Sequence, residues 1–276
     1  MSASPSALLA KKLAGFAPGD LKHVFFTTCG STAVDSAIRF VHFYNNVLGR
    51  PRKKKVISRE KSYHGSTYLS ASMSGKSRDK EWLDTANERV HLLPDVNPSR
   101  RPEGMSVEDF LEEKITDLET AIQTLGAENV GAFIAEPVLA SGGVIIPPKG
   151  YHKRCLEVCR QHDVLYISDE VVTAFGRLGH WFASKEVFDI EPDIITCAKG
   201  LTSGYVPMGP ASFLIASSAK SPGSIPKVRR SPTATLIRGI RSVQPPPSRI
   251  SKSLKMKACW STFVKSHPIF SNASGS

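Results

Sequence analysis

Lys199 is the side chain of this sequence whose position best suits covalent chemistry. It follows the strand-like residues 193–197 and precedes Gly200, in a run that should be buried. A lysine held in apolar surroundings has a lowered pKa, and its free amine can attack a carbonyl to form a Schiff base. The alternative is a lysine at a strand end whose ammonium group reaches water along its aliphatic stem. The position alone leaves both interpretations open.

Carboxylates end two further apolar segments. Asp169 and Glu170 follow residues 164–168, and Glu136 follows residues 130–135. A carboxylate in such a place is costly unless a partner compensates for its burial. It is either the partner of a cationic ligand atom or a residue that caps a helix and forms an ion pair.

Gly30, Ser31 and Thr32 are suited to a phosphate, because they follow an expected strand and open an expected helix. Free backbone N–H groups and the positive end of the helix dipole bind anions at such a place. Ser and Thr also favour helix N-caps, so a capped helix start without a ligand is the alternative.

Tyr63, His64 and Gly65 place an aromatic face and an imidazole after another expected strand, with a glycine that allows close backbone approach. Such a trio also occurs as a packed turn. Taken together, a phosphate loop, an aromatic ring, a strand-end aspartate and a strand-end lysine are the parts that a pyridoxal 5′-phosphate site needs. No other common cofactor needs all four.

The elements that must position these residues alternate along the chain. We expect strands at short apolar or β-branched segments and helices at amphipathic ones. The expected strands are 23–28, 55–59, 130–136, 164–169, 193–197 and 211–216, and the expected helices are 31–47, 106–125 and 151–162. This alternation predicts an α/β domain with a mostly parallel sheet, whose ligands collect at the carboxyl ends of the strands.

Residues 16–217 resemble the class III (omega-type) pyridoxal-phosphate-dependent aminotransferases. The matching motifs, in chain order, are GST at 30–32, YHG at 63–65, DEVVTAFGR at 169–177 and DIITCAKGL at 193–201. Ala174 stands where the family usually has glycine. The resemblance implies the large domain of a fold type I transferase, with a mostly parallel sheet flanked by helices and with the small C-terminal domain missing.

The resemblance also implies a role for each candidate residue. Lys199 would form the Schiff base with the cofactor and then move the proton between the substrate Cα and the cofactor. Asp169 would pair with the pyridine nitrogen and keep it protonated, which makes the ring an electron sink. The rest of the implied cofactor-binding set is Gly30, Ser31 and Thr32 at the phosphate, Tyr63 and Val171 on the two ring faces, Glu136 in the surrounding polar network, and His64.

The resemblance extends to the substrates. Relatives that use 2-oxoglutarate commonly carry a Glu five positions after the Glu of a Glu-Pro motif, and this sequence has Ser141 there. With residues 144–151, this is similar to the branch that moves an amino group from an omega-amino acid or amine to pyruvate. The implied partners are thus a small amino donor and a 2-oxo acid, with a homodimer in full-length relatives.

Residues 221–276 differ from the rest of the chain. They hold ten basic and no acidic residues, which leaves 26 basic and 25 acidic residues in the first 220. We predict a pyridoxal-phosphate-binding domain over 1–220 and a basic, Pro/Ser-rich, disordered tail over 221–276. The abrupt change indicates a truncation or a shifted reading frame. An inactive cofactor-binding or interaction protein is therefore the alternative to a working transaminase.

Composition disfavours other classes. Five cysteines without zinc-type spacing predict reduced thiols, a cytoplasmic location and no metal site. We find neither a long apolar run nor a secretory signal, so we expect no membrane partner. Few aromatic residues are interleaved with the basic charges of the tail, which argues against a nucleic-acid partner.

Overall fold

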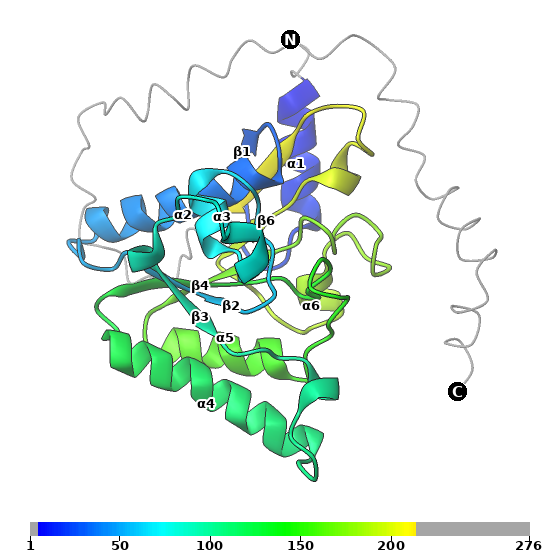
Figure 1. Cartoon of the computed structure of the whole chain (residues 1–276). Coiled ribbons are helices and arrows are strands. Elements are labelled where there is room, and N and C mark those ends of the chain that lie inside the picture. The colour runs from blue at the N-terminus through cyan, green and yellow to red at the C-terminus, as the bar shows by residue number, and fades with distance from the viewer. Residues whose placement is uncertain (1–4, 214–276) are drawn as a thin grey trace, which may run out of the picture. The chain divides into compact units, whose positions relative to one another are not determined.

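The structure is a computed structural model that describes residues 5–213, and its centre is a seven-stranded sheet (Figure 1). The strands lie in the order β1, β7, β6, β5, β4, β2, β3. Their bounds are β1 His23–Thr27, β2 Lys55–Arg59, β3 Val90–Leu93, β4 Val130–Ala135, β5 Leu165–Asp169, β6 Ile194–Thr196 and β7 Gly209–Phe213.

The sheet is mostly parallel. Only β7, among the described strands, runs against its neighbours β6 and β1. β4 is buried at every position, as expected for an inner strand of a parallel sheet that is covered on both faces. The predicted α/β class and mostly parallel sheet are confirmed. Because the other six strands share one direction, their carboxyl ends meet at one edge of the sheet.

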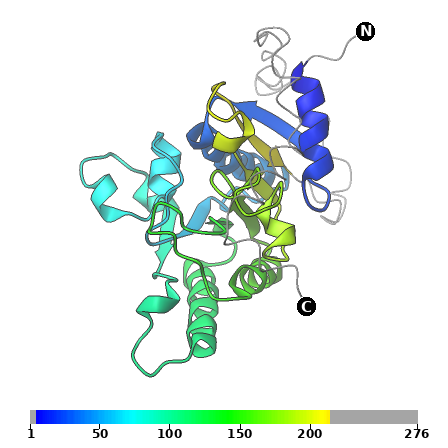
Figure 2. The same cartoon turned by 90° about the vertical axis from the view of Figure 1, so that its right-hand side faces the viewer.

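Helices cover both faces of the sheet (Figures 1 and 2). The helix bounds are α1 Pro5–Phe16, α2 Gly30–Val47, α3 Tyr68–Met73, α4 Val107–Leu125, α5 Tyr151–Gln161 and α6 Ala183–Glu186, with 3₁₀ turns η1 Ser77–Lys80, η2 Asn87–Arg89, η3 Pro98–Arg100 and η4 Lys199–Leu201. One apolar cluster joins α2 to the sheet through Ala37, Ile134 and Ile167. A second joins α4 and α5 to the opposite face through Leu118, Cys155 and Phe133.

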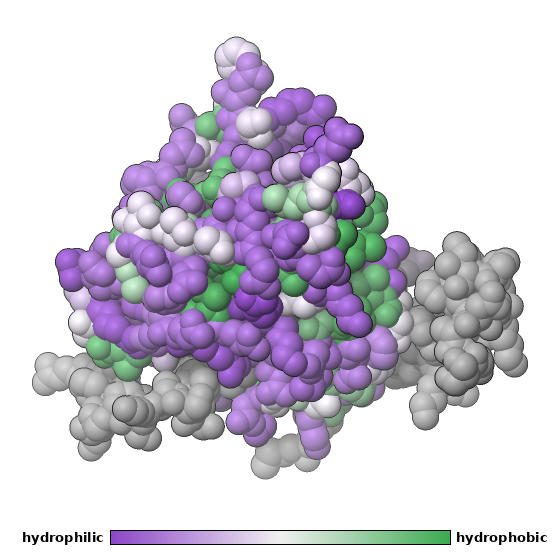
Figure 3. All heavy atoms as spheres, turned by 90° about the horizontal axis from the view of Figure 1, so that it is seen from below, coloured by the Kyte–Doolittle hydropathy of each residue, from purple (hydrophilic) through white to green (hydrophobic). Residues whose placement is uncertain are grey.

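The outer surface of the α4 and α5 layer is mostly hydrophilic, as Figure 3 shows from below. Each of these helices therefore buries one apolar stripe and exposes a polar one. Among the residues that the structure describes, no helix is both long and apolar enough to cross a bilayer.

The sequence pattern located the long elements and missed the short ones. The three predicted helices appear as α2, α4 and α5, with ends displaced by one residue. β7 begins two residues earlier than expected, and residues 214–216 lie outside the described part. β3, α1 and α3 were not predicted; β3 has four residues, of which only Leu93 is buried. The predicted tail over 221–276 also lies outside the described residues, so that prediction and the domain boundary stay predictions.

Candidate functional site

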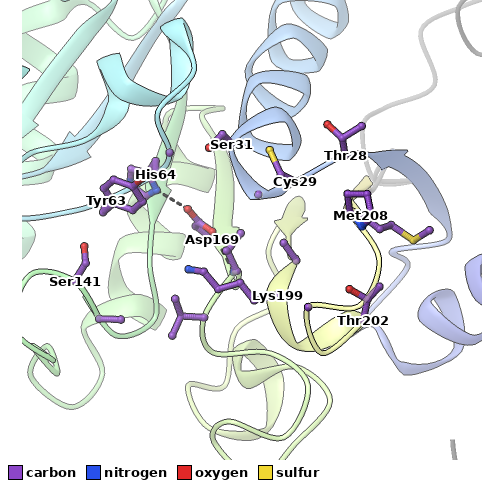
Figure 4. Close-up of a pocket in the computed structure, with 18 of the residues that line it drawn as sticks. Thr28, Cys29, Ser31, Tyr63, His64, Ser141, Asp169, Lys199, Thr202 and Met208 are labelled. Atoms are coloured by element: carbon purple, nitrogen blue, oxygen red, sulfur yellow. Dashed lines mark hydrogen bonds and ion pairs between the residues drawn. The ribbon is translucent and has the colours of Figure 1, made fainter. Parts of the chain in front are cut away.

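A pocket of about 660 Å³ lies at the carboxyl edge of the sheet. It is formed by the start of α2, by the segments that follow β2, β4, β5 and β6, and by the segment before β7. Figure 4 shows its polar side chains, which come from separate elements. The lining residues are Thr28, Cys29, Gly30, Ser31, Tyr63, His64, Gly65, Glu136, Ala140, Ser141, Asp169, Val171, Val172, Ala198, Lys199, Thr202, Gly204, Val206, Pro207 and Met208.

Lys199 begins the turn η4 directly after β6, and its amine points into the pocket (Figure 4). Its φ of +37° lies in the left-handed region, which costs a non-glycine residue about 1 kcal/mol or more. The next residue fits only as a glycine without rearrangement, because a Cβ on Gly200 would lie 3.1 Å from the Cβ of Phe175. A strained backbone held by tight packing is a common feature of functional sites.

Asp169 ends β5 and is buried in a network of three hydrogen bonds. Its Oδ2 lies 2.6 Å from the Nδ1 of His64, which is also buried. Its Oδ1 accepts from the backbone N–H of Val171 at 3.2 Å and from the Thr196 hydroxyl at 3.1 Å. These bonds fix the orientation of a carboxylate that faces the pocket, where it can pair with a cationic ligand atom.

Glu170 belongs to a different environment, although it is adjacent in sequence. Its carboxylate accepts from the backbone N–H groups of Ala183 at 2.6 Å and Ser184 at 3.0 Å, and it does not line the pocket. Burial raises the pKa of Glu170, while these hydrogen bonds oppose the rise. Asp169 therefore faces the pocket, where it could be the partner of a ligand, whereas Glu170 caps the start of α6.

Glu136 follows β4 and connects the pocket to its aromatic wall. Its Oε1 accepts from the backbone N–H of Tyr63 at 2.9 Å. Burial raises the pKa of the Glu136 carboxyl, and the charge of Asp169 adds to the rise, while His64 and the Tyr63 N–H oppose it. The carboxylate therefore ties the segment after β4 to the segment after β2.

The start of α2 lies at the pocket through Gly30 and Ser31 but not through Thr32. The Thr32 hydroxyl lies 3.1 Å from the backbone nitrogen of Cys29, so it caps the helix instead. The Ser31 hydroxyl accepts from the backbone N–H of Ser66 at 3.1 Å. The structure thus brings together eight of the nine predicted site residues and leaves Thr32 outside the pocket lining.

Two glycines allow backbone and side chains to approach closely at this end of the pocket. A Cβ on Gly30 would lie 3.0 Å from both γ-carbons of Val171. A Cβ on Gly65, whose φ is +136°, would lie 2.6 Å from the Ser31 hydroxyl oxygen. These contacts bring the start of α2 close to Val171 on one side and to the segment after β2 on the other.

His64 adds a buried polar atom without a partner. Its Nε2 is buried and has no hydrogen-bond partner among the described residues. Buried polar atoms are rarely left unpaired in native proteins, so each exception requires an explanation. An anion site at a helix start, a buried carboxylate, an aromatic face and a lysine amine in one pocket together fit a phosphorylated aldehyde with a basic ring nitrogen.

Sequence reasoning assigned no role to several lining residues. Cys29 is one of them: burial raises its pKa, but hydrogen bonds with Thr32 and Ser31 outweigh this effect, and the net shift is downward. The segment 202–208 is another. Gly204 and Pro207 mark it as a turn before the last strand, and that signal could have placed it at the same edge of the sheet.

Comparisons with known proteins agree with this geometry. A family model described as "Aminotransferase class-III" matches residues 1–214. An uncharacterized aminotransferase, y4uB, of Sinorhizobium fredii (strain NBRC 101917 / NGR234) is 43% identical over 208 residues, which cover 73% of this chain and 43% of that protein. Gamma-aminobutyrate transaminase 1, mitochondrial, of Oryza sativa subsp. indica is 44% identical over 214 residues, which cover 74% of this chain and 40% of that protein.

A solved structure is similar as well. The omega transaminase from Pseudomonas jessenii in complex with PMP has a TM-score of 0.74 and 39% identity, and the match covers 77% of this chain and 47% of that chain. The present chain thus spans less than half the length of the curated relatives and of the solved structure that it matches.

Proposed function

This chain belongs to the class-III aminotransferase family, and from that premise we propose that it transfers an amino group from an omega-amino acid or amine to a 2-oxo acid. Pyridoxal 5′-phosphate is the cofactor of this family. The observation that carries the proposal is one pocket that gathers Lys199, Asp169 and the start of α2 from three separate elements.

The pocket residues divide into three groups by what they would hold. Gly30 and Ser31, at the positive end of an 18-residue helix, would hold the phosphate. Tyr63 and Val171 would contact the two faces of the ring. When bound, the cofactor supplies an electron-withdrawing ring that stabilises the negative charge left when the donor carbon loses a proton.

Proton movement falls to two residues. The Lys199 amine would attach the cofactor covalently and, once released, take the proton from the donor carbon and deliver it to the cofactor carbon that bears the amino group. Asp169 would keep the ring nitrogen protonated, and its bonds to His64 and Thr196 hold the carboxylate in place for that task. Glu136 would keep the Tyr63 backbone in position beneath the ring.

The pocket lining supports an omega-amino acid or amine donor and pyruvate as the acceptor. Ser141 lines the pocket at the position where relatives that use 2-oxoglutarate commonly carry a glutamate. The lining of the same pocket also includes Val172, Val206 and Met208, which favour contact with aliphatic groups. A small uncharged 2-oxo acid side group suits such a lining better than a second carboxylate does.

We further propose that two copies of the chain associate. We also propose that the protein resides in the reducing environment of the cytoplasm. Tyr68, Trp82 and Leu83 are 58%, 89% and 51% exposed, which is unusual for three large apolar side chains in one region of the chain. Cys29, Cys155 and Cys159 are free thiols, which supports a reducing compartment. Analytical ultracentrifugation of the cofactor-loaded chain tests the dimer, and a concentration-independent monomer would contradict it.

The transfer reaction is tested by absorption spectroscopy of the 276-residue chain reconstituted with pyridoxal phosphate. We expect beta-alanine or an omega-amine to convert the absorption band of the bound cofactor, and pyruvate to restore it with formation of alanine. A cofactor band that no amine changes would contradict the proposed transfer and support the alternative of a cofactor-binding protein without turnover.

A further inference from the structure

The turn after β4 is held by two side chains that do not line the pocket. Arg59, the last residue of β2, donates from Nη2 to the backbone oxygen of Glu136 at 2.6 Å. His152, on α5, lies with Nε2 2.9 Å from the backbone oxygen of Pro137. Two consecutive carbonyls are thus bonded from two different elements, which fixes the direction of the chain at Glu136.

The protonation state of His152 follows from its partners. A carbonyl oxygen only accepts, so Nε2 carries the hydrogen and Nδ1 is left as an acceptor. Tyr166, whose hydroxyl lies 2.8 Å from Nδ1, therefore donates to it. Burial, with the nearby charge of Arg59, lowers the pKa of His152 to about 3. The ring is neutral at ordinary pH and is held by both nitrogens.

Arg59 is an unusual residue to find in this position. Its side chain is fully buried, and it lies 5.7 Å from the ring centre of Tyr151. Nε and Nη1 have no hydrogen-bond partner among the described residues, and no carboxylate there forms an ion pair with it. A buried charge without an ion-pair partner costs folding free energy instead of supplying it. Its benefit must be sought in what it positions.

The held turn acts on the pocket through Glu136. The Glu136 carboxylate accepts from the Tyr63 N–H, and both residues line the pocket. Tyr63 is followed by His64, the partner of Asp169. Although burial raises the pKa of Glu136, the positive charge of Arg59 is among the influences that lower it. Arg59 thus affects both the place and the charge of this carboxylate.

We propose that Arg59 and His152 are positioning residues for the cofactor: by holding the carbonyls of Glu136 and Pro137, they set the place of the Glu136 carboxylate and, through it, of the Tyr63 ring. The inference rests on the proposed function in one respect, namely that pyridoxal phosphate is the ligand of this pocket. It assigns neither residue a contact with cofactor or substrate.

The test compares Arg59→Met and Arg59→Lys with the unchanged chain. Arg154→Met is the matched control, because Arg154 lies on α5, is partly exposed and pairs with Glu112 away from the pocket. Three quantities are measured: the Kd for pyridoxal phosphate, the circular dichroism of the bound cofactor, and the urea midpoint of the cofactor-free protein. We expect Arg59→Met to weaken binding about tenfold or more, as for a lost hydrogen bond to a charged group.

The same variant should lose most of the cofactor's circular dichroism while its urea midpoint stays unchanged or rises. Arg59→Lys, which keeps the charge and one donor, should restore part of both signals. Unchanged binding and dichroism in a folded Arg59→Met would overturn the proposal, as would equal losses in Arg154→Met. If Arg59→Met does not fold, Tyr166→Phe removes only the hydroxyl that fixes the His152 ring. Its dichroism should then fall, and an unchanged spectrum would overturn the proposal.

Failure of the proposed function would look different. If the unchanged chain acquires no bound cofactor, the pocket assignment itself is wrong. If the unchanged chain binds the cofactor and the Arg59 variants bind it equally well, only the positioning role is refuted.

Discussion

Replacing His152 with glutamine should reduce the free energy of unfolding that the protein loses when the pH is lowered. The folded pKa of about 3 lies below the ordinary value of 6.5, so between these values the unfolded chain binds a proton that the folded chain does not. The free energy of unfolding therefore rises with pH across this window, is level above about 6.5, and falls as the pH drops. At 1.36 kcal/mol per pH unit, lowering the pH from 7.5, where the unfolded histidine is mostly neutral, to 4.5 removes about 2.7 kcal/mol through this residue alone.

Urea unfolding of the cofactor-free protein at the two pH values measures this loss. The amide of His152→Gln can still donate to the Pro137 oxygen, but it cannot titrate, so its loss should be smaller by about 2.7 kcal/mol. His180→Gln is the control, because His180 is exposed, and it should lose as much stability as the unchanged chain does. If the His152→Gln variant and the unchanged chain lose equal free energy of unfolding, His152 is not a neutral ring that is hydrogen-bonded through both nitrogens.

Three further changes probe other parts of the site and fold. Gly65→Ala should weaken pyridoxal phosphate binding about tenfold or more, because its φ of +136° disfavours a side chain and the Cβ would meet Ser31; an equilibrium titration with unchanged affinity would contradict this. The pKa of Lys53 is lowered to about 8, mainly by burial and then by the charge of Arg50, so the free energy of unfolding should rise between pH 8 and 10.5. In urea unfolding, Lys53→Met should lack about 3 kcal/mol of that rise. Parallel pH profiles of the variant and the unchanged chain would contradict this. Asp169→Asn should keep the cofactor but slow its conversion by an amine about tenfold or more in stopped-flow absorption; equal rates would exclude the proposed role.

The sequence was informative where a pattern repeats or an apolar run ends. Six consecutive apolar or small residues define β4, and the polar residue that follows each parallel strand could be assigned to one edge. Asp169 and Lys199 were both found in this way, although β5 and β6 supply them separately. β3 escaped because four residues are too few to reveal a period.

Side-chain direction and long-range pairing could not be inferred from the pattern. His64 and Asp169 are 105 residues apart, and their contact depends on the order of the strands in the sheet. Thr32 and Ser31 are neighbours of similar chemistry, yet one caps the helix and the other lines the pocket. Arg59 ends a strand, where a charged residue would be expected to reach water, but the α5 layer covers it.

The central claim is that Lys199 is the residue that attaches pyridoxal phosphate in this pocket. Borohydride reduction of the reconstituted 276-residue chain, followed by peptide mapping with mass spectrometry, tests it most directly. We predict one reduced cofactor adduct, located on Lys199, which disappears in Lys199→Ala and persists in Lys149→Ala, a change at an exposed lysine that does not line the pocket. An adduct on another lysine, or an undiminished adduct in Lys199→Ala, would contradict the claim.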